Sequence, residues 1–149
     1  MGQQQLFLLI LVVILVGIAT IVAVNVFGTS VNEANRDAVR QDLLLGASNA
    51  QQIWERPLAI NGAANNFNNL TNDQLLSRLN IIGIFENSVI ENENGIYSLV
   101  SIGVSEIRLV GEPKSDTEDI EIIICTSGTS RGWHFNIGPP NVDRPSECD

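Results

Sequence analysis

The feature that most constrains this chain is an apolar run from Leu6 to Val24 that carries no charge and one polar side chain, Thr20. As a helix rising ~1.5 Å per residue, the run would be roughly 28 Å long, close to the ~30 Å hydrocarbon core of a bilayer. All 17 acidic and 8 basic residues of the 149-residue chain lie at or after Glu33. We therefore predict that residues 1–28 form a retained hydrophobic helix that can cross a membrane.

A cleaved secretory signal is the main alternative for this run. Such signals carry a basic n-region, a shorter apolar core and a small-residue cleavage site. Here no basic residue precedes Arg36, the apolar run is longer, and no A-x-A site follows it. A retained helix is therefore favoured, and because basic residues are lacking near its ends, the sequence leaves its orientation in the membrane open.

An amphipathic pattern follows the apolar run. Over residues 29–56, apolar side chains recur every three or four positions, as they do on one face of a helix. The side chains on this face are Val39, Leu43, Ala47, Ala50 and Trp54. Gly28 weakens a helix by only ~1 kcal/mol and no proline occurs before Pro57, so we predict one helix from about residue 3 to 55.

The remaining residues, 57–149, are predicted to form a globular head. Residues Pro57 to Leu70 lack a sustained period and indicate a surface loop. Thr71 has the side chain of an N-cap for a short helix from Asn72 to Leu79. The side chains that this helix would bury are Leu75, Leu76 and Leu79.

Alternating apolar and polar residues in the head predict an antiparallel meander of four or five strands. The predicted strands are Ser88–Asn92, Ile96–Ile102, Ser105–Val110, Ile120–Cys125 and Trp133–Ile137. Asn94–Gly95 is predicted to be a type I′ turn between the first two, and Gly111–Asp119 a charged loop. Because a sheet with one apolar face needs a cover, the helix over residues 29–56 is expected to pack on it. The predicted fold class is α+β, with a long N-terminal helix on a small antiparallel sheet.

No group of catalytic residues stands out in the sequence. The phosphate-binding, dinucleotide-binding, serine-nucleophile and zinc-protease motifs are absent. The single histidine, His134, follows Trp133 and is typical of an edge or half-buried strand residue. Pairing it as a base with Cys125 as a nucleophile leaves no third group to orient the base. We therefore predict no enzymatic activity, no cofactor and no metal site.

Two weaker patterns have simpler explanations. Carboxylates gather in the last third of the chain without the spacing of an EF-hand, so solvated loop charge is favoured over a cation site. These carboxylates are Asp116, Glu118, Asp119, Asp143, Glu147 and Asp149. Asn69 to Thr71 form an N-x-T sequon, a triplet that often occurs by chance.

Charge and cysteine content limit the partners. A formal net charge of −9, a pI near 4.4 and a single lysine, Lys114, argue against nucleic acid or anionic lipid as a ligand.

Both cysteines, Cys125 and Cys148, lie in the last 25 residues. In an oxidising compartment they could close a C-terminal loop worth ~3 kcal/mol. The alternative is two buried or free thiols.

The chain as a whole resembles the type IV pilin and pseudopilin superfamily. The most specific match is Gly2 to Val24, GQQQLFLLILVVILVGIATIVAV, in which Gly2 resembles the glycine after which the family's prepilin peptidase cuts. Residues Gln51 to Pro57 resemble the junction between helix and head. Cys125 and Cys148 match the family's disulfide around a C-terminal loop.

The sequence departs from the family at the N-terminus. The family's leader is longer and basic, whereas only Met1 precedes Gly2. The family usually carries a glutamate five residues into the mature protein, where this chain has Gln5 as numbered, or Phe7 after a cut at Gly2. The processing and assembly region implied is therefore Gly2, Gln3, Gln5 and Phe7. Glutamine can accept a hydrogen bond from an amine at a lower desolvation cost than a carboxylate.

The resemblance implies a structural subunit of an extracellular type IV pilus-like filament, a helical homopolymer joined through its N-terminal helices. It also implies an inner-membrane location before assembly, processing and methylation, and the prepilin peptidase and pilus assembly machinery as partners. Two alternatives are a minor pseudopilin of a type II-like secretion system and a single-pass, membrane-anchored binding domain. A helix that is apolar on all sides from Leu6 to Val16 favours the polymer. The sequence does not choose among adhesion, motility, DNA uptake and conduction.

Overall fold

The computed structural model describes residues 2–126 and 132–148 and divides into two compact units, one up to Ala34 and one from Asn35 onward. The first unit is the N-terminal part of α1 (Gly2–Glu55), a single unbroken helix, as predicted. The second unit adds the C-terminal part of α1 to the predicted head, and we refer to it as the head unit.

The first unit consists of helix alone, and every side chain from Gly2 to Ala34 is exposed. Its few hydroxyl groups hydrogen-bond within the helix: Thr20 donates to the Val16 carbonyl at 2.7 Å and Ser30 to the Val26 carbonyl at 2.9 Å. A hydroxyl that donates to a carbonyl of its own helix needs no hydrogen-bond acceptor outside the helix. The polar residues of this segment are therefore compatible with an apolar environment.

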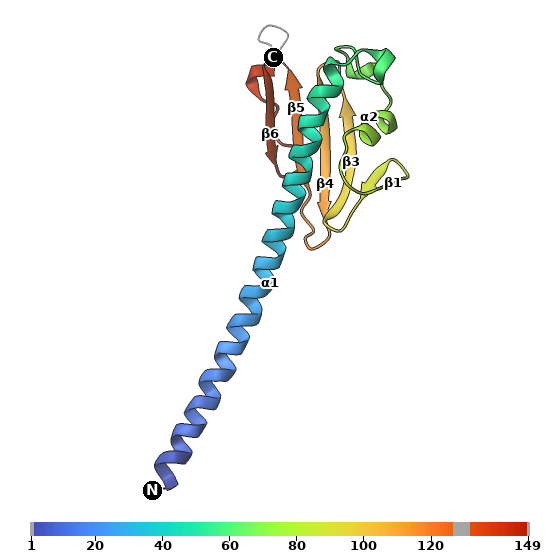
Figure 1. Ribbon diagram of the computed structural model, residues 1–149. Helices are drawn as coiled ribbons and strands as arrows, with labels where there is room; N and C mark the ends of the chain where they lie inside the picture. The colour runs from blue at the N-terminus through green and yellow to red at the C-terminus, as the bar shows by residue number, and fades with distance from the viewer. Residues whose placement is uncertain (1, 127–131, 149) are drawn as a thin grey trace. The chain divides into compact units, whose positions relative to one another are not determined.

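The head unit contains one antiparallel sheet whose six strands follow one another in chain order (Figure 1). The strands are β1 (Ile84–Glu86), β2 (Val89–Glu91), β3 (Gly95–Ile102), β4 (Glu106–Pro113), β5 (Ile120–Thr126) and β6 (Trp133–Gly138). The short helices are η1 (Leu58–Ile60), η2 (Phe67–Asn69), α2 (Asn72–Arg78) and η3 (Ser146–Cys148). The predicted α+β class is confirmed.

The C-terminal part of α1 covers one face of the sheet, which we term the inner face (Figure 1). The helix residues buried there are Val39, Leu43, Gly46, Ala47, Ala50 and Ile53. The helix approaches the sheet closely at Gly111, where a Cβ atom would lie 2.6 Å from Cγ1 of Val39. Trp54, predicted on the buried face, is half-buried and packs edge-on against Trp133 with 5.5 Å between ring centroids.

The sheet is larger than predicted. Strand β1 was not predicted, because its turn into β2, Asn87–Ser88, lacks the glycine that usually marks a two-residue hairpin turn. Strand β4 runs on to Pro113, so the predicted loop from Gly111 is wrong at its start. Gly111 and Pro113 are buried on the inner face, where a residue without a large side chain fits beneath α1.

The predicted type I′ turn at Asn94–Gly95 is also wrong. Neither residue has a positive φ, and the Oδ1 atom of Asn92 accepts the backbone N–H groups of both at 2.9 and 3.0 Å. The turn with two positive φ angles is Asn87–Ser88, at 51° and 64°, which joins β1 to β2. Gly95 belongs to β3, where a Cβ atom would lie 2.4 Å from the backbone oxygen of Glu112. Because Gly95 has no side chain, the backbones of β3 and β4 can approach each other closely at this point.

The predicted loop after Pro57 closes the C-terminal end of α1. The backbone N–H groups of Ala63, Ala64 and Asn65 donate to helix-end carbonyls at 2.8, 2.8 and 2.7 Å. The last carbonyl groups of a helix have no partner within the helix, so this loop satisfies them. The accepting carbonyls are those of Ile53, Arg56 and Trp54, respectively.

The short helix α2 forms as predicted and ends at Arg78, one residue earlier than expected. Thr71 and Gln74 make a reciprocal capping box, in which each side chain accepts a backbone N–H of the other residue at 3.3 Å. The three leucines predicted to be buried, Leu75, Leu76 and Leu79, are all buried.

Candidate functional site

The exposed apolar surface of the first unit is the largest candidate site. No described residue covers the side chains from Leu6 to Phe27, and Phe7 is 76% exposed. A contiguous apolar surface of this size marks a contact with lipid or with other protein. By length and composition α1 can cross a membrane. The helix is therefore long and apolar enough to serve as a membrane anchor.

The residues predicted for processing and assembly lie on the first two turns of α1, and all are exposed. Gln3 and Phe7 are four residues apart and share one side of the helix, whereas Gln5 lies on a different side. Gly2, Gln3, Gln5 and Phe7 therefore surround the helix end and do not converge on one point.

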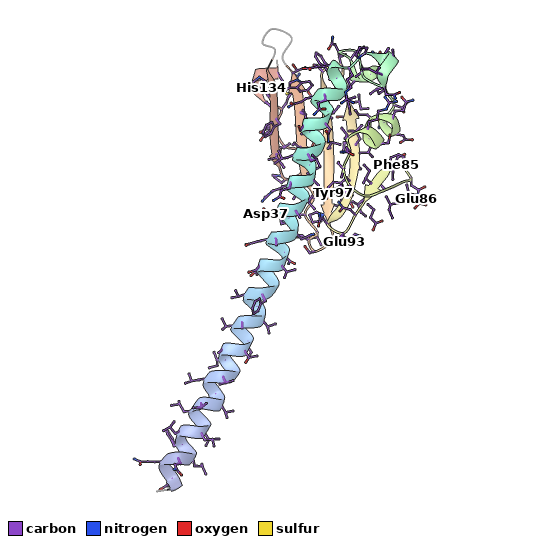
Figure 2. All side chains as sticks on the ribbon, in the orientation of Figure 1. Asp37, Phe85, Glu86, Glu93, Tyr97 and His134 are labelled. Atoms are coloured by element: carbon purple, nitrogen blue, oxygen red, sulfur yellow. A yellow bond between two sulfur atoms is a disulfide. The ribbon has the colours of Figure 1, made fainter. Side chains whose placement is uncertain are left out.

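The two cysteines form a disulfide, Cys125–Cys148, between β5 and η3. Disulfides persist in oxidising compartments and are rare in the reducing cytosol. Since Cys125 is bonded to Cys148, its sulfur cannot pair with His134 as a nucleophile. His134 itself is half-buried on edge strand β6, as predicted (Figure 2). The disulfide therefore indicates a non-reducing compartment for the head unit.

The disulfide anchors residues 139–148, which we term the C-terminal strap, to the outer face of the sheet. The strap N–H of Asn141 donates to Glu121 Oε2 at 2.5 Å, and the Asp143 carbonyl accepts from Asn136 Nδ2 at 3.0 Å. Arg144 Nε lies 2.7 Å from Glu106 Oε2. These contacts explain why Glu121, an outward-facing carboxylate of β5, is buried.

A second polar cluster joins α1 to the turn between β2 and β3. The Oδ2 atom of Asp42 accepts three hydrogen bonds, from Tyr97 Oη at 2.5 Å and from the Nδ2 atoms of Asn92 and Asn94 at 3.0 Å each. Burial and the carboxylate of Asp42 raise the pKa of Tyr97, so its hydroxyl stays protonated and donates. The cluster fixes the turn between β2 and β3 against α1.

The start of the head unit is held by two neighbouring helix residues. Asn35 donates to the Asn94 carbonyl at 2.9 Å and accepts from the Ser115 hydroxyl at 2.7 Å. Arg36 Nη1 lies 2.6 Å from Asp116 and 3.1 Å from Glu118. Two of the carboxylates predicted to be solvated loop charge therefore form ion pairs with α1. No group of three metal-binding side chains occurs in the part of the chain that the structure describes.

The pairing of Arg36 with Asp116 predicts an acid-dependent loss of stability. The guanidinium of Arg36, followed by the N–H of Thr117, lowers the pKa of Asp116 below its ordinary value of 3.8. A group with a depressed folded-state pKa contributes stability above its unfolded pKa and loses it as pH falls through the folded pKa. The stability gap between wild type and Asp116→Asn should therefore shrink as the pH is lowered from about 6 to 2. Urea unfolding across this range measures it, with Asp73→Asn as a surface control. A gap that stays constant would contradict the assignment.

The sequon at Asn69 is part of the loop structure. Asn69 Nδ2 donates to the Ala63 carbonyl at 2.9 Å, and Thr71 is engaged in the capping box of α2. The side chains of the sequon thus have local structural roles.

Comparisons with models of protein families, with characterised proteins and with solved structures found no match. The class of protein follows from the fold and the sites themselves. The chain is an α+β protein with a long apolar N-terminal helix able to anchor it in a membrane, and with a disulfide-bonded sheet unit.

Proposed function

We propose that the protein is a structural subunit of an extracellular type IV pilus-like filament that polymerises through its N-terminal hydrophobic helix. It would reside in the inner membrane before assembly, with the prepilin peptidase and the assembly machinery as partners. The observation that carries the proposal is the uncharged, fully exposed helix of the first unit.

The length of the uncharged helix supports a role beyond anchoring. From Gly2 to Asn32 there is no charge. At ~1.5 Å per residue this segment is roughly 46 Å long, whereas a bilayer has a hydrocarbon core of ~30 Å. The uncharged stretch thus exceeds what lipid tails cover. Packing of many such helices side by side would cover all of it, and the internally bonded hydroxyls of Thr20 and Ser30 would not oppose this.

The polar end of the helix also suits a dry core. Gln3, Gln4 and Gln5 offer carboxamides that donate and accept hydrogen bonds without charge. Burying a neutral amide that finds a partner costs far less than burying a carboxylate. In the proposed filament, these carboxamides would bond to neighbouring copies.

Electron microscopy of filaments sheared from cells, combined with mass spectrometry of the subunit, tests the proposal. We expect the chain to be the main component of a filament, and a subunit beginning at Gln3 would show cleavage after Gly2. Absence of the chain from every filament would overturn the proposal. Retention in the membrane after shearing would favour a membrane-anchored binding domain, the second candidate, which the groove described below also favours.

A substitution at Gly17 tests polymerisation through the helix. A Cβ atom at Gly17 would contact nothing within 4 Å in the single chain. Gly17→Leu should therefore leave the head unit and membrane insertion intact, because leucine favours the bilayer. Small residues allow packed helices to approach closely. Filament yield should fall by roughly tenfold or more, the effect of a steric cost of about 1.4 kcal/mol or more at each contact. Ile18→Leu, which conserves volume, should assemble normally. Equal yields from both variants would contradict close packing at Gly17.

A further inference from the structure

A groove of about 750 Å³ lies over the hairpin formed by β1 and β2. We term it the hairpin groove. Its lining residues are Asp42, Ile82, Gly83, Ile84, Glu86, Asn87, Val89, Glu91, Asn92, Glu93, Asn94 and Lys114. The volume falls within the ~300–1,000 Å³ range of ligand sites.

The groove has an apolar floor. Ile84 pairs with Glu91 and Glu86 with Val89, so all four side chains project from the same, outer face of the hairpin. Ile84 is 73% exposed and Val89 is half-buried. Ile84 is thus largely uncovered by the described residues, and Val89 is covered only in part.

Carboxylates surround the floor. Glu91 is neutralised by Lys114, whose Nζ lies 2.8 Å from Glu91 Oε1. Within residues 2–126 and 132–148, neither Glu86 nor Glu93 has an ion-pair partner. Figure 2 shows Glu86 on the hairpin and Glu93 at the turn that leads into β3. The groove therefore presents two unpaired negative charges beside an apolar surface.

β1 lines the groove with Ile84 and Glu86, and its outer edge is free. β1 is the first strand of the sheet and pairs on one side only. A two-residue turn at Asn87–Ser88 closes the hairpin with a hydrogen-bonded pair, Glu86 and Val89. In the alternation of antiparallel strands, the next residue, Phe85, then points its N–H and C=O away from β2. An extended chain can bond to such an edge.

The groove is held in shape before any ligand binds. The side chain of Asn92 donates both to Asp42 at 3.0 Å and to the Ile82 carbonyl at 2.9 Å. Asn94 donates to the same carboxylate oxygen at 3.0 Å. A preformed site avoids the cost of ordering its residues on binding.

From these observations we propose that the hairpin groove binds an extended, cationic segment of another protein. Apolar side chains of the segment would contact Ile84 and Val89, its backbone would bond to Phe85, and lysine or arginine side chains would pair with Glu86 and Glu93. The proposal does not depend on filament formation.

Charge complementarity excludes a second copy as the preferred occupant. The chain has a formal net charge of −9, so two heads repel each other. Most of its cations already pair with its own carboxylates. The paired side chains are Arg36, Arg40, Arg108, Lys114 and Arg144. A second copy therefore offers few cations for Glu86 and Glu93, and a basic partner fits better.

The full chain in nanodiscs of neutral lipid provides the test. The probe is a short synthetic peptide of alternating lysine and valine, and a peptide of alternating glutamate and valine is its control. We expect fluorescence anisotropy to show saturable binding of the lysine peptide alone. Glu86→Gln with Glu93→Gln should weaken it by roughly tenfold, as expected for two exposed ion pairs, and should reduce its salt dependence. Ile84→Ser should weaken it at unchanged charge.

A matched control removes the same charge elsewhere. Glu55→Gln with Asp73→Asn changes two exposed carboxylates outside the groove and should leave the affinity unchanged. Equal weakening by the control pair would show attraction to the acidic surface in general and overturn the proposal. Wild-type affinity in the Glu86 and Glu93 variant would do the same. Self-association of wild type that this variant abolishes would identify a second copy as the occupant, contrary to the proposal.

Discussion

Asp42→Ala is expected to destabilise the head unit by about 3 kcal/mol, because hydrogen bonds to a charged acceptor contribute ~1.5–3 kcal/mol and unpaired buried donors add a further penalty. The substitution removes the acceptor of three donors, those of Tyr97, Asn92 and Asn94. Tyr97 is 0% exposed, so its hydroxyl loses a partner in a buried setting. Denaturant unfolding followed by the fluorescence of Trp54 and Trp133 measures the change.

Two further variants separate the carboxylate from its surroundings. Tyr97→Phe removes one donor but leaves Asp42 bonded to Asn92 and Asn94, so it should lower the free energy of unfolding by about 1 kcal/mol. The double variant Asp42→Ala with Tyr97→Phe should lose less stability than the sum of the two single variants, because each single variant already removes the bond between Tyr97 and Asp42. Asp37→Ala, an exposed residue on the same helix that pairs with Arg40, should change stability by about 0.5 kcal/mol or less. A similarly small effect of Asp42→Ala would contradict the role of the cluster.

The extent and buried face of α1 could be predicted from the sequence, because periodicity reports directly which side of a helix is apolar. Val39, Leu43, Ala47 and Ala50 were predicted on one face, and all four are buried. The buried leucines of α2 were predicted for the same reason. Local patterns suffice where the structure depends on neighbours within one or two turns.

Glycine and proline positions were harder to interpret. Gly95 follows an asparagine, a pair typical of tight turns, yet it lies in a strand where two backbones approach each other. Gly111 has the same role beneath Val39. A glycine satisfies either requirement, and the choice depends on what packs above it, which no local pattern contains.

The polar contacts between distant parts of the head unit could not be predicted, in contrast to the local cap at Thr71. Asp42 bonds to residues about fifty positions away, and Arg36 pairs with Asp116 80 positions away. A polar residue beside the buried face of an amphipathic helix is a weak signal, since most such residues are solvated. The hairpin groove was missed because β1 was not predicted, so the part of its lining that β1 supplies had no predicted place in the sheet.

Loss of the disulfide is expected to destabilise the head unit about as much as Asp42→Ala does. Cys125 and Cys148 are separated by 23 positions. Closing a loop of this length lowers the conformational entropy of the unfolded chain, which stabilises the folded state by about 3.5 kcal/mol. Alanine is the better replacement for both, because Cys125 is 0% exposed and a serine hydroxyl there would add the cost of an unpaired buried group. The double alanine variant should unfold at a correspondingly lower denaturant concentration.

The disulfide also determines what the C-terminal strap covers. Ile123 lies on the outer face of β5 and is 0% exposed, and Glu121 on the same face bonds to the strap at Asn141. When the strap detaches, Glu121 loses its bond to Asn141 and the outer face of β5 loses the strap that is anchored to it, so the loss should extend to the whole head unit. We expect faster proteolysis of the strap together with a lower unfolding midpoint, and a reductant should reproduce both in the wild type but change nothing in the variant. Faster proteolysis with an unchanged midpoint would instead show that the strap opens on its own, and that α1 packed on the inner face suffices to hold the sheet together.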